Sequence, residues 1–159
     1  ARGLTPRQDE EHAMADFVFN IAKGAVAEMA RDGATAFLVL LLKASIADNS
    51  QKDFDDLSAL IADAGVDEAD FTNYARKTGL TATITVDDSN DRVDVDLPDQ
   101  TWTAAGGASN NTLTDLVVAY QNSASDSGRV PCTQHDFAVT TDGSDLTAAF
   151  NAAGFYRAS

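Results

Sequence analysis

The feature that most constrains the fold of this chain is an apolar run at residues 36–44, with the sequence AFLVLLLKA. Its strongly apolar part, Phe37 to Leu42, is far too short to cross a membrane, which takes about 20 apolar residues. The run has the length of a β-strand, and an unbroken apolar run is typical of a strand that is covered on both faces. We therefore expect this segment to be a buried central strand.

Most of the remaining patterns also predict strands. Apolar and polar residues alternate over 17–21, which indicates a first strand. They alternate again over 81–86 and 93–97, and the turn-forming residues 87–91 between these runs predict a hairpin. Further strands are expected around Trp102 and over 113–120, 130–140 and 146–157. Residues 46–51 have the composition of a polar linker.

One segment, residues 53–64, has the pattern of a helix. Asp53 can cap its first turn, and Gly65 can end it. The apolar residues that share one face of this helix are Phe54, Leu57, Leu60 and Ile61. The chain is therefore expected to be a β-rich α+β protein, an antiparallel sandwich or open barrel with one clear helix at 53–64.

The length of 159 residues suits one domain with a substantial core. We expect residues 16–159 to form that domain. Residues 1–15 are polar and charged without an apolar period, so they predict an extended N-terminal arm that anchors the chain on a neighbour. Residues 1–8 lack the apolar stretch of a signal peptide. The predicted core consists of Phe17, Phe19, Leu38, Leu40, Ile84, Val93, Val95, Trp102, Leu116, Val118, Phe137 and Val139.

The charge balance excludes several classes of partner. The chain has 25 Asp and Glu against 11 Lys and Arg, a net charge of −14. Such a surface repels the phosphates of nucleic acids and the headgroups of an anionic bilayer, so no nucleic acid and no membrane is expected as a partner. The single cysteine, Cys132, excludes an internal disulfide and a cysteine-based structural zinc site.

The thiol and the imidazoles are the first candidates for chemistry. Cys132 and His135 could form an activated nucleophile and its base. A spacing of three on a strand places their side chains on opposite faces, so we expect a core or loop pair instead. His12 lies in the predicted arm and is expected to be solvated.

The aspartates are the second set of candidates. The loop residues Asp87, Asp88, Asn90 and Asp91 crowd oxygen ligands of the kind that calcium prefers. The EF-hand spacing fails because Arg92 stands where that loop needs glycine, so a solvated hairpin loop is expected. Asp94 and Asp96 share a strand face and are expected to point to solvent, whereas acid–base catalysis needs two carboxyls in different environments.

The remaining candidates have ordinary structural interpretations. Trp102 and Tyr120 could form a binding platform, but a buried place in a sheet core is the expected one. The triplet Asn110-Asn111-Thr112 matches a glycosylation signal and is interpreted as a loop. The chain has no P-loop, no glycine-rich dinucleotide turn, no serine elbow and no metalloprotease helix motif. We therefore assign no catalytic, cofactor-binding or metal-binding residue from the sequence.

Four segments resemble a known protein family. They are residues 19–24 (FNIAKG), 87–102 (DDSNDRVDVDLPDQTW), 135–140 (HDFAVT) and 150–158 (FNAAGFYRA). They resemble a family of small virion structural proteins of tailed double-stranded DNA bacteriophages, many of which infect actinobacteria. The resemblance covers residues 17–159, and the arm is additional to it.

The resemblance implies a particle component that carries out no reaction. The first role that the resemblance implies is that of a capsid decoration protein. Such a protein is made in the host cytoplasm, binds the outside of the major capsid lattice and stabilises it. A minor tail or fibre-base protein is the alternative, and a small enzyme is a more distant one. The implied partners are the major capsid protein and, as in many decoration proteins, further copies in a homotrimer. Its uncharged contacts are expected near residues 101–108 and 148–153.

Overall fold

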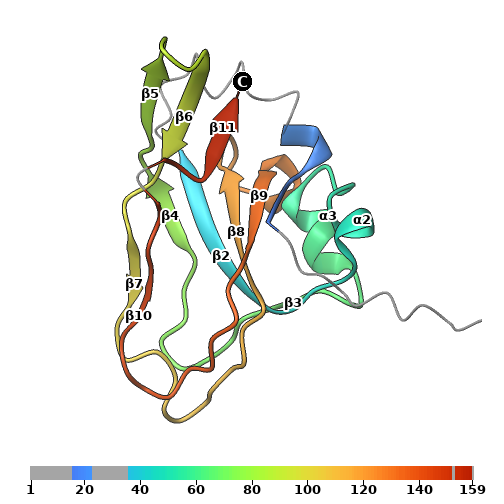
Figure 1. Cartoon of the computed structure of the whole chain (residues 1–159). Helices are drawn as coiled ribbons and strands as arrows, with labels where there is room; N and C mark the ends of the chain where they lie inside the picture. Colours follow the sequence, from blue (N-terminus) through green and yellow to red (C-terminus); the bar gives the residue numbers. More distant parts are fainter. Residues whose placement is uncertain (1–15, 23–35, 152, 159) are drawn as a thin grey trace, which may run out of the picture.

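The computed structural model describes residues 16–22, 36–151 and 153–158 (Figure 1). Its strands are β1 (Phe17–Val18), β2 (Phe37–Ala44), β3 (Asp67–Glu68), β4 (Lys77–Leu80), β5 (Thr83–Asp87), β6 (Arg92–Asp96), β7 (Gln100–Trp102), β8 (Asp115–Tyr120), β9 (Val130–Asp136), β10 (Leu146–Ala148) and β11 (Tyr156–Ala158). Its helices are α2 (Asp48–Gln51), α3 (Leu57–Ala62) and the 3-10 turn η1 (Asp126–Gly128). The expectation of a β-rich α+β fold is confirmed. The predicted arm, residues 1–15, lies outside the described residues.

The main sheet is antiparallel, with the order β1-β9-β8-β2-β3, and β4 also pairs with β2. Its centre is the pair β2 and β8, in register from Phe37 opposite Tyr120 to Leu42 opposite Asp115. Residues 37–42 and 115–120 are all buried, so the expectation that the apolar run forms a strand covered on both faces is confirmed. Within the described residues the sheet order is an open path, which favours the sandwich over a closed barrel.

Each face of the main sheet has its own cover (Figure 1). The helices α2 and α3 lie on one side, where Gln51 of α2 reaches Gln134 of β9. The strand pair β7–β10 lies on the other side. There the ring of Phe37 lies 5.5 Å from that of Phe155, which precedes β11. The sheet β11-β6-β5 continues this second layer to the upper end of the molecule.

The predicted hairpin is confirmed, with β5 and β6 in register from Thr83 opposite Asp96 to Asp87 opposite Arg92. Its far end projects from the body, and Val86 there is 66% exposed although it shares a strand face with the partly buried Ile84. Gly154 lies beside this sheet with φ of +85°, and a Cβ at this position would meet the carbonyl oxygen of Val95. Both the backbone conformation and the close approach therefore require glycine.

The predicted helix is wrong in its extent, because α3 covers only Leu57–Ala62. Asp56, not Asp53, caps it and accepts a hydrogen bond of 2.8 Å from the Ala59 N–H. All three aspartates of residues 53–56 have side chains that can cap a helix. The helix starts after Asp56, where the Leu57 N–H donates a tertiary hydrogen bond to the Arg129 carbonyl. The predicted linker 46–51 contains α2, which is a second correction: Gln51 is fully buried and anchors that turn.

Several strand bounds also differ from the expectation. In the first segment only Phe17–Val18 is a strand, and residues 20–22 are helical. The expected last strand over 146–157 is divided into β10 and β11, and the described residues between them, 149–151 and 153–155, are irregular. Seven predicted core residues are buried: Phe19, Leu38, Leu40, Val95, Trp102, Leu116 and Val118. Five are partly buried: Phe17, Ile84, Val93, Phe137 and Val139.

Candidate functional site

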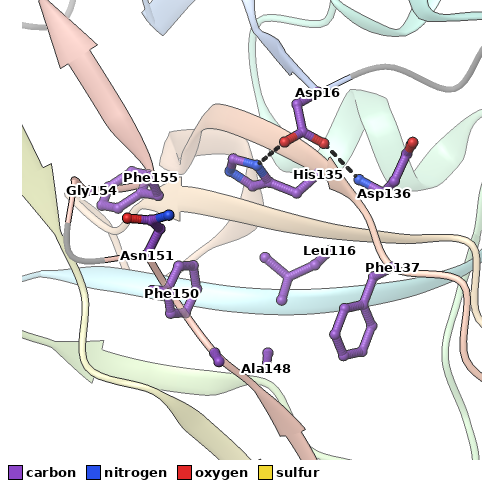
Figure 2. A pocket seen from close by; sticks show the side chains of 11 residues that line it. Asp16, Leu116, His135, Asp136, Phe137, Ala148, Phe150, Asn151, Gly154 and Phe155 are labelled. Atoms are coloured by element: carbon purple, nitrogen blue, oxygen red, sulfur yellow. Dashed lines mark hydrogen bonds and ion pairs between the residues drawn. The ribbon is translucent and has the colours of Figure 1, made fainter.

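A groove near titratable side chains lies between the main sheet and residues 148–151 and 154–155 (Figure 2). Its volume is about 300 Å³, and its apolar lining comes from Leu116, Phe137, Ala148, Phe150 and Phe155. A second hollow of about 250 Å³ shares Asp16, His135, Gly154 and Phe155 with the first. Asp16 and His135 therefore line both hollows and are the polar centre of the groove.

His135 is held at both ring nitrogens. Its Nδ1 lies 3.1 Å from Asp16 Oδ2, and its Nε2 lies 2.9 Å from the hydroxyl of Thr133. The other oxygen of Asp16 accepts a hydrogen bond of 2.9 Å from the Asp136 N–H (Figure 2). Thr133 and His135 share a face of β9 because they are two residues apart. Asp16 reaches them because β1 pairs with β9, with Phe17 opposite Gln134.

This hydroxyl–imidazole–carboxylate chain has the connectivity of a catalytic triad. A nucleophile must reach the reacting atom of its substrate, however, and Thr133 is only 1% exposed. In this structure these hydrogen bonds instead connect β1 to β9 at the edge of the main sheet. The sequence pattern suggested only Cys132 as a partner of His135, whereas its actual partners are Asp16 and Thr133. The spacing of Thr133 and His135 was an available signal, whereas the proximity of Asp16 depends on strand pairing.

Cys132 is a core residue. It is fully buried, and its burial raises the pKa of the thiol to about 12. Its Sγ lies 3.5 Å from the carbonyl oxygen of Val130. Since both ring nitrogens of His135 are bonded to Asp16 and Thr133, the imidazole does not activate this thiol.

Asp94 is placed differently from the expectation, which was that it points to solvent. It is 8% exposed and lies between two arginines, 2.7 Å from Arg157 Nε and 3.2 Å from Arg92 Nε. The reason is the pairing of β11 with β6, which puts Arg157 directly opposite Asp94. Asp96 is partly buried and accepts a hydrogen bond of 2.9 Å from the Leu97 N–H.

The acidic hairpin loop is stabilised from within. Asp87 accepts a hydrogen bond of 2.7 Å from the Asn90 amide and lies 3.1 Å from Arg92 Nε. The Asn90 hydrogen bond and the charge of Arg92 together hold the pKa of Asp87 below its ordinary value. Within the described ranges, no cluster of three or more His, Cys, Asp or Glu side chains is arranged to hold a metal ion.

The aromatic candidates are buried, as expected. Trp102 is 1% exposed and donates a hydrogen bond of 2.8 Å to the Ala75 carbonyl, and Tyr120 is 6% exposed. The triplet at 110–112 lies in a loop, where Asn111 accepts hydrogen bonds from the backbone of Asp70 and Phe71. His12 lies outside the described residues.

A buried polar chain crosses the helix-covered face of the main sheet, and the sequence analysis missed it. The Gln51 amide donates to Gln134, which in turn donates a hydrogen bond of 3.0 Å to Asp115 Oδ1. Asp115 is 1% exposed, and its second oxygen has no hydrogen-bond partner within the described part of the chain. Asp136 lies opposite Asp115 in the ladder. Desolvation and the charges of Asp16, Asp115 and Asp48 raise the pKa of Asp136.

A partly buried ion-pair network ties the loops at the β3 side of the molecule. Arg76 binds both oxygens of Glu68, at 2.7 and 2.6 Å, and donates to Asp126 at 2.7 Å. Arg129 also donates to Asp126 at 2.7 Å, and the Tyr74 hydroxyl donates to Glu68 at 2.7 Å. Burial alone would raise the pKa of Asp126, but hydrogen bonds from the two arginines hold it below its ordinary value.

Comparisons of the chain with family models, with curated proteins and with solved structures found no match. None of the helices in the described ranges is long and apolar enough to cross a membrane.

Proposed function

We propose that this chain is a non-enzymatic structural protein of a tailed bacteriophage virion. In this proposal it binds the outside of the major capsid lattice and stabilises the shell. The structural observation that supports this proposal most is that the reactive side chains are buried or bonded to other residues of the same chain. Cys132 is buried, His135 is bonded at both ring nitrogens, and Asp94 lies between two arginines.

The surface charge supports a place on the outer side of a shell. A net charge of −14 repels the packaged DNA, so contact with the interior of a filled head is unfavourable. It also keeps particles apart in solution, because like-charged surfaces repel one another. The proposed partner is the major capsid protein, with neither a nucleic acid nor a membrane as a ligand.

The test is to count copies of the chain in purified particles. Quantitative mass spectrometry against the major capsid protein is expected to give hundreds of copies per particle. A handful of copies would assign the chain to the tail or fibre base, and absence from purified particles would refute a virion role. Added back to shells that lack it, the purified chain is expected to raise the temperature at which the shell disassembles.

A small enzyme is the second candidate, and one observation favours it: the chain of hydrogen bonds from Thr133 through His135 to Asp16. The substitution Thr133→Val keeps the shape of the side chain and removes its hydroxyl. If the protein hydrolyses activated esters and Thr133→Val abolishes this activity, the protein is an enzyme. We expect no difference in turnover between the two proteins.

A further inference from the structure

The outer edge of β5 has no pairing partner among the described strands. β5 is the end strand of the sheet β11-β6-β5, in the hairpin at the upper end of Figure 1. Val86 on this strand is 66% exposed and is the exposed large hydrophobic residue of the described chain. An unpaired strand edge with an exposed β-branched side chain is a template for pairing with another strand.

The hydrogen bonding of β6 determines which groups of β5 face outward. The Val95 carbonyl accepts a hydrogen bond of 3.0 Å from the Phe155 N–H, so the backbone polar groups of Val95 point to the β11 side. Ile84 lies opposite Val95 in the antiparallel ladder, and its own N–H and C=O therefore point away from β6. The same holds for Val86, two residues further along. The edge of β5 that no described strand pairs with thus offers the backbone groups of Ile84 and Val86.

This edge is complementary to itself. In an antiparallel pair of β5 strands with Thr85 on the two-fold axis, Ile84 of one copy lies opposite Val86 of the other. Each of these residue pairs exchanges both of its N–H···O=C bonds. The apolar side chains then meet on one face, and the Thr85 side chains meet on the other. Both are favourable cross-strand pairs.

The acidic residues disfavour the registers that are shifted toward the loops. With Thr85 on the axis, Asp87 lies opposite Thr83, and the two loops at 87–91 lie at opposite ends of the paired strands. A shift of two residues toward the loops would bring both groups of aspartates together, which is unfavourable for like charges. In each copy the charge of Asp87 is already offset by Arg92 at 3.1 Å.

We propose that β5 pairs with β5 of a second copy of this chain, antiparallel about a two-fold axis through Thr85. The strand has only five residues, so the contact is smaller than the roughly 1,000 Å² of a stable interface and gives a weak dimer in solution. Copies held near one another would pair more completely, because the effective concentration is then higher. The inference does not depend on the proposed virion role.

The test is disulfide trapping of the purified chain. In a non-hydrogen-bonded antiparallel pair the Cα atoms lie about 4.5 Å apart, which a disulfide can bridge. Thr85→Cys is therefore expected to form a covalent dimer on mild oxidation. Thr83→Cys is the matched control, since Thr83 is also exposed and on the same face of β5. In the proposed register the two copies of residue 83 are about 13 Å apart along the strands, too far for a disulfide.

We expect the Thr85→Cys protein to dimerise at least ten-fold faster than the Thr83→Cys protein at equal concentration. Cys132 is fully buried and is the same in both proteins. Equal rates for the two variants would overturn the proposal, and a faster rate for Thr83→Cys would show a different register.

A second substitution tests the edge itself. Val86→Pro, added to Thr85→Cys, removes a backbone N–H that points away from β6, so the hairpin keeps its own hydrogen bonds. Trapping is expected to fall to the rate of the Thr83→Cys control. If the proline variant is unfolded by its melting curve, Val86→Lys replaces it, because it keeps the backbone and removes the apolar contact. Trapping that stays fast in a folded edge variant would overturn the proposal.

Discussion

Asp136 is exposed, yet partial desolvation and three neighbouring carboxylates raise its pKa, and it is the one described carboxyl group with a resolved upward shift. The neighbours come from different parts of the chain: Asp16 precedes β1, Asp115 is on β8, and Asp48 is on α2. His135 acts in the opposite direction and lowers this pKa. Near neutral pH, therefore, ionised Asp136 opposes folding.

We expect Asp136→Asn to raise the melting temperature at pH 7. A carboxyl whose folded pKa is raised favours the folded state at low pH, and this contribution is lost as the pH rises from about 3.9 through the folded pKa. The gain should therefore vanish at about pH 3, where both states are protonated. Melting curves of the variant and the parent protein at the two pH values measure it.

Asp142→Asn is the matched control with the opposite sign. Hydrogen bonds from the Ser144 hydroxyl and N–H lower the pKa of Asp142. Its contribution is present above the unfolded pKa and is lost as the pH falls through the folded pKa. We expect Asp142→Asn to lower the melting temperature at pH 7. A change of the same sign in both variants would contradict the assignment.

The thiol of Cys132 should report on global unfolding. Because the side chain is fully buried and its pKa is raised to about 12, the reactive thiolate is absent from the folded protein near pH 8. We expect a disulfide reagent to label Cys132 only as fast as the chain unfolds. Rapid labelling under native conditions would show that the β9 region opens locally.

At the scale of single elements, the central strands and the ion-pair network hold the fold in different ways. β2 and β8 contribute apolar side chains that are buried on both faces. The Arg76 network instead joins the segments around β3 and η1 through ion pairs to Glu68 and Asp126. Substitutions in the two regions should therefore differ in their dependence on salt and pH.

Leu40→Ala should destabilise the protein by about 2–5 kcal/mol, since Leu40 is fully buried in β2 and the substitution leaves a cavity. Val86→Ala is the control, because Val86 is 66% exposed, and it should cost less than about 1 kcal/mol. Urea unfolding of both variants at low protein concentration measures the difference. Similar losses would mean that the hairpin end is packed.

Arg76→Ala should destabilise the chain by about 2–3 kcal/mol, because it leaves Glu68 without its bidentate partner and weakens the hold on Asp126. Arg76→Lys should restore only part of the loss, since an ammonium cannot bind both oxygens of Glu68 in the same way. Denaturant unfolding at pH 7 measures both. Full rescue by lysine would show that charge alone is needed.

At the scale of the whole molecule, the net charge of −14 opposes every contact between copies. Ala105, Gly106 and Ala148 are buried in the fold, so those parts of the expected trimer contacts cannot face another copy. Exposed uncharged residues remain in the same segments, among them Thr101, Thr103 and Gly107.

Association of copies should strengthen as the salt concentration rises, because salt screens the repulsion between the acidic surfaces. Sedimentation of the Val86→Pro variant in low and high salt tests the trimer separately from pairing through β5. We expect a trimer that grows with salt. A species that stays monomeric in both conditions, at high protein concentration, would exclude intrinsic trimerisation.

Local patterns were enough to predict much of this fold. The unbroken apolar run at 36–44 predicts a strand covered on both faces, and the alternation around residues 87–91 predicts the hairpin of β5 and β6. Such features depend on backbone periodicity and turn chemistry, which act over a few residues. The acidic character of the surface likewise follows directly from composition.

The environment of individual side chains depends on contacts between distant parts of the chain. Asp94 is buried because Arg157, 63 residues away, lies opposite it, and His135 is fixed by Asp16, 119 residues away. Val86 is exposed because its hairpin extends past the body of the molecule. The apolar–polar alternation of β5 would instead predict a buried side chain at this position. The physical reason is that burial and ion pairing depend on which distant strands pair, and alternation identifies a strand's two faces but not what covers them.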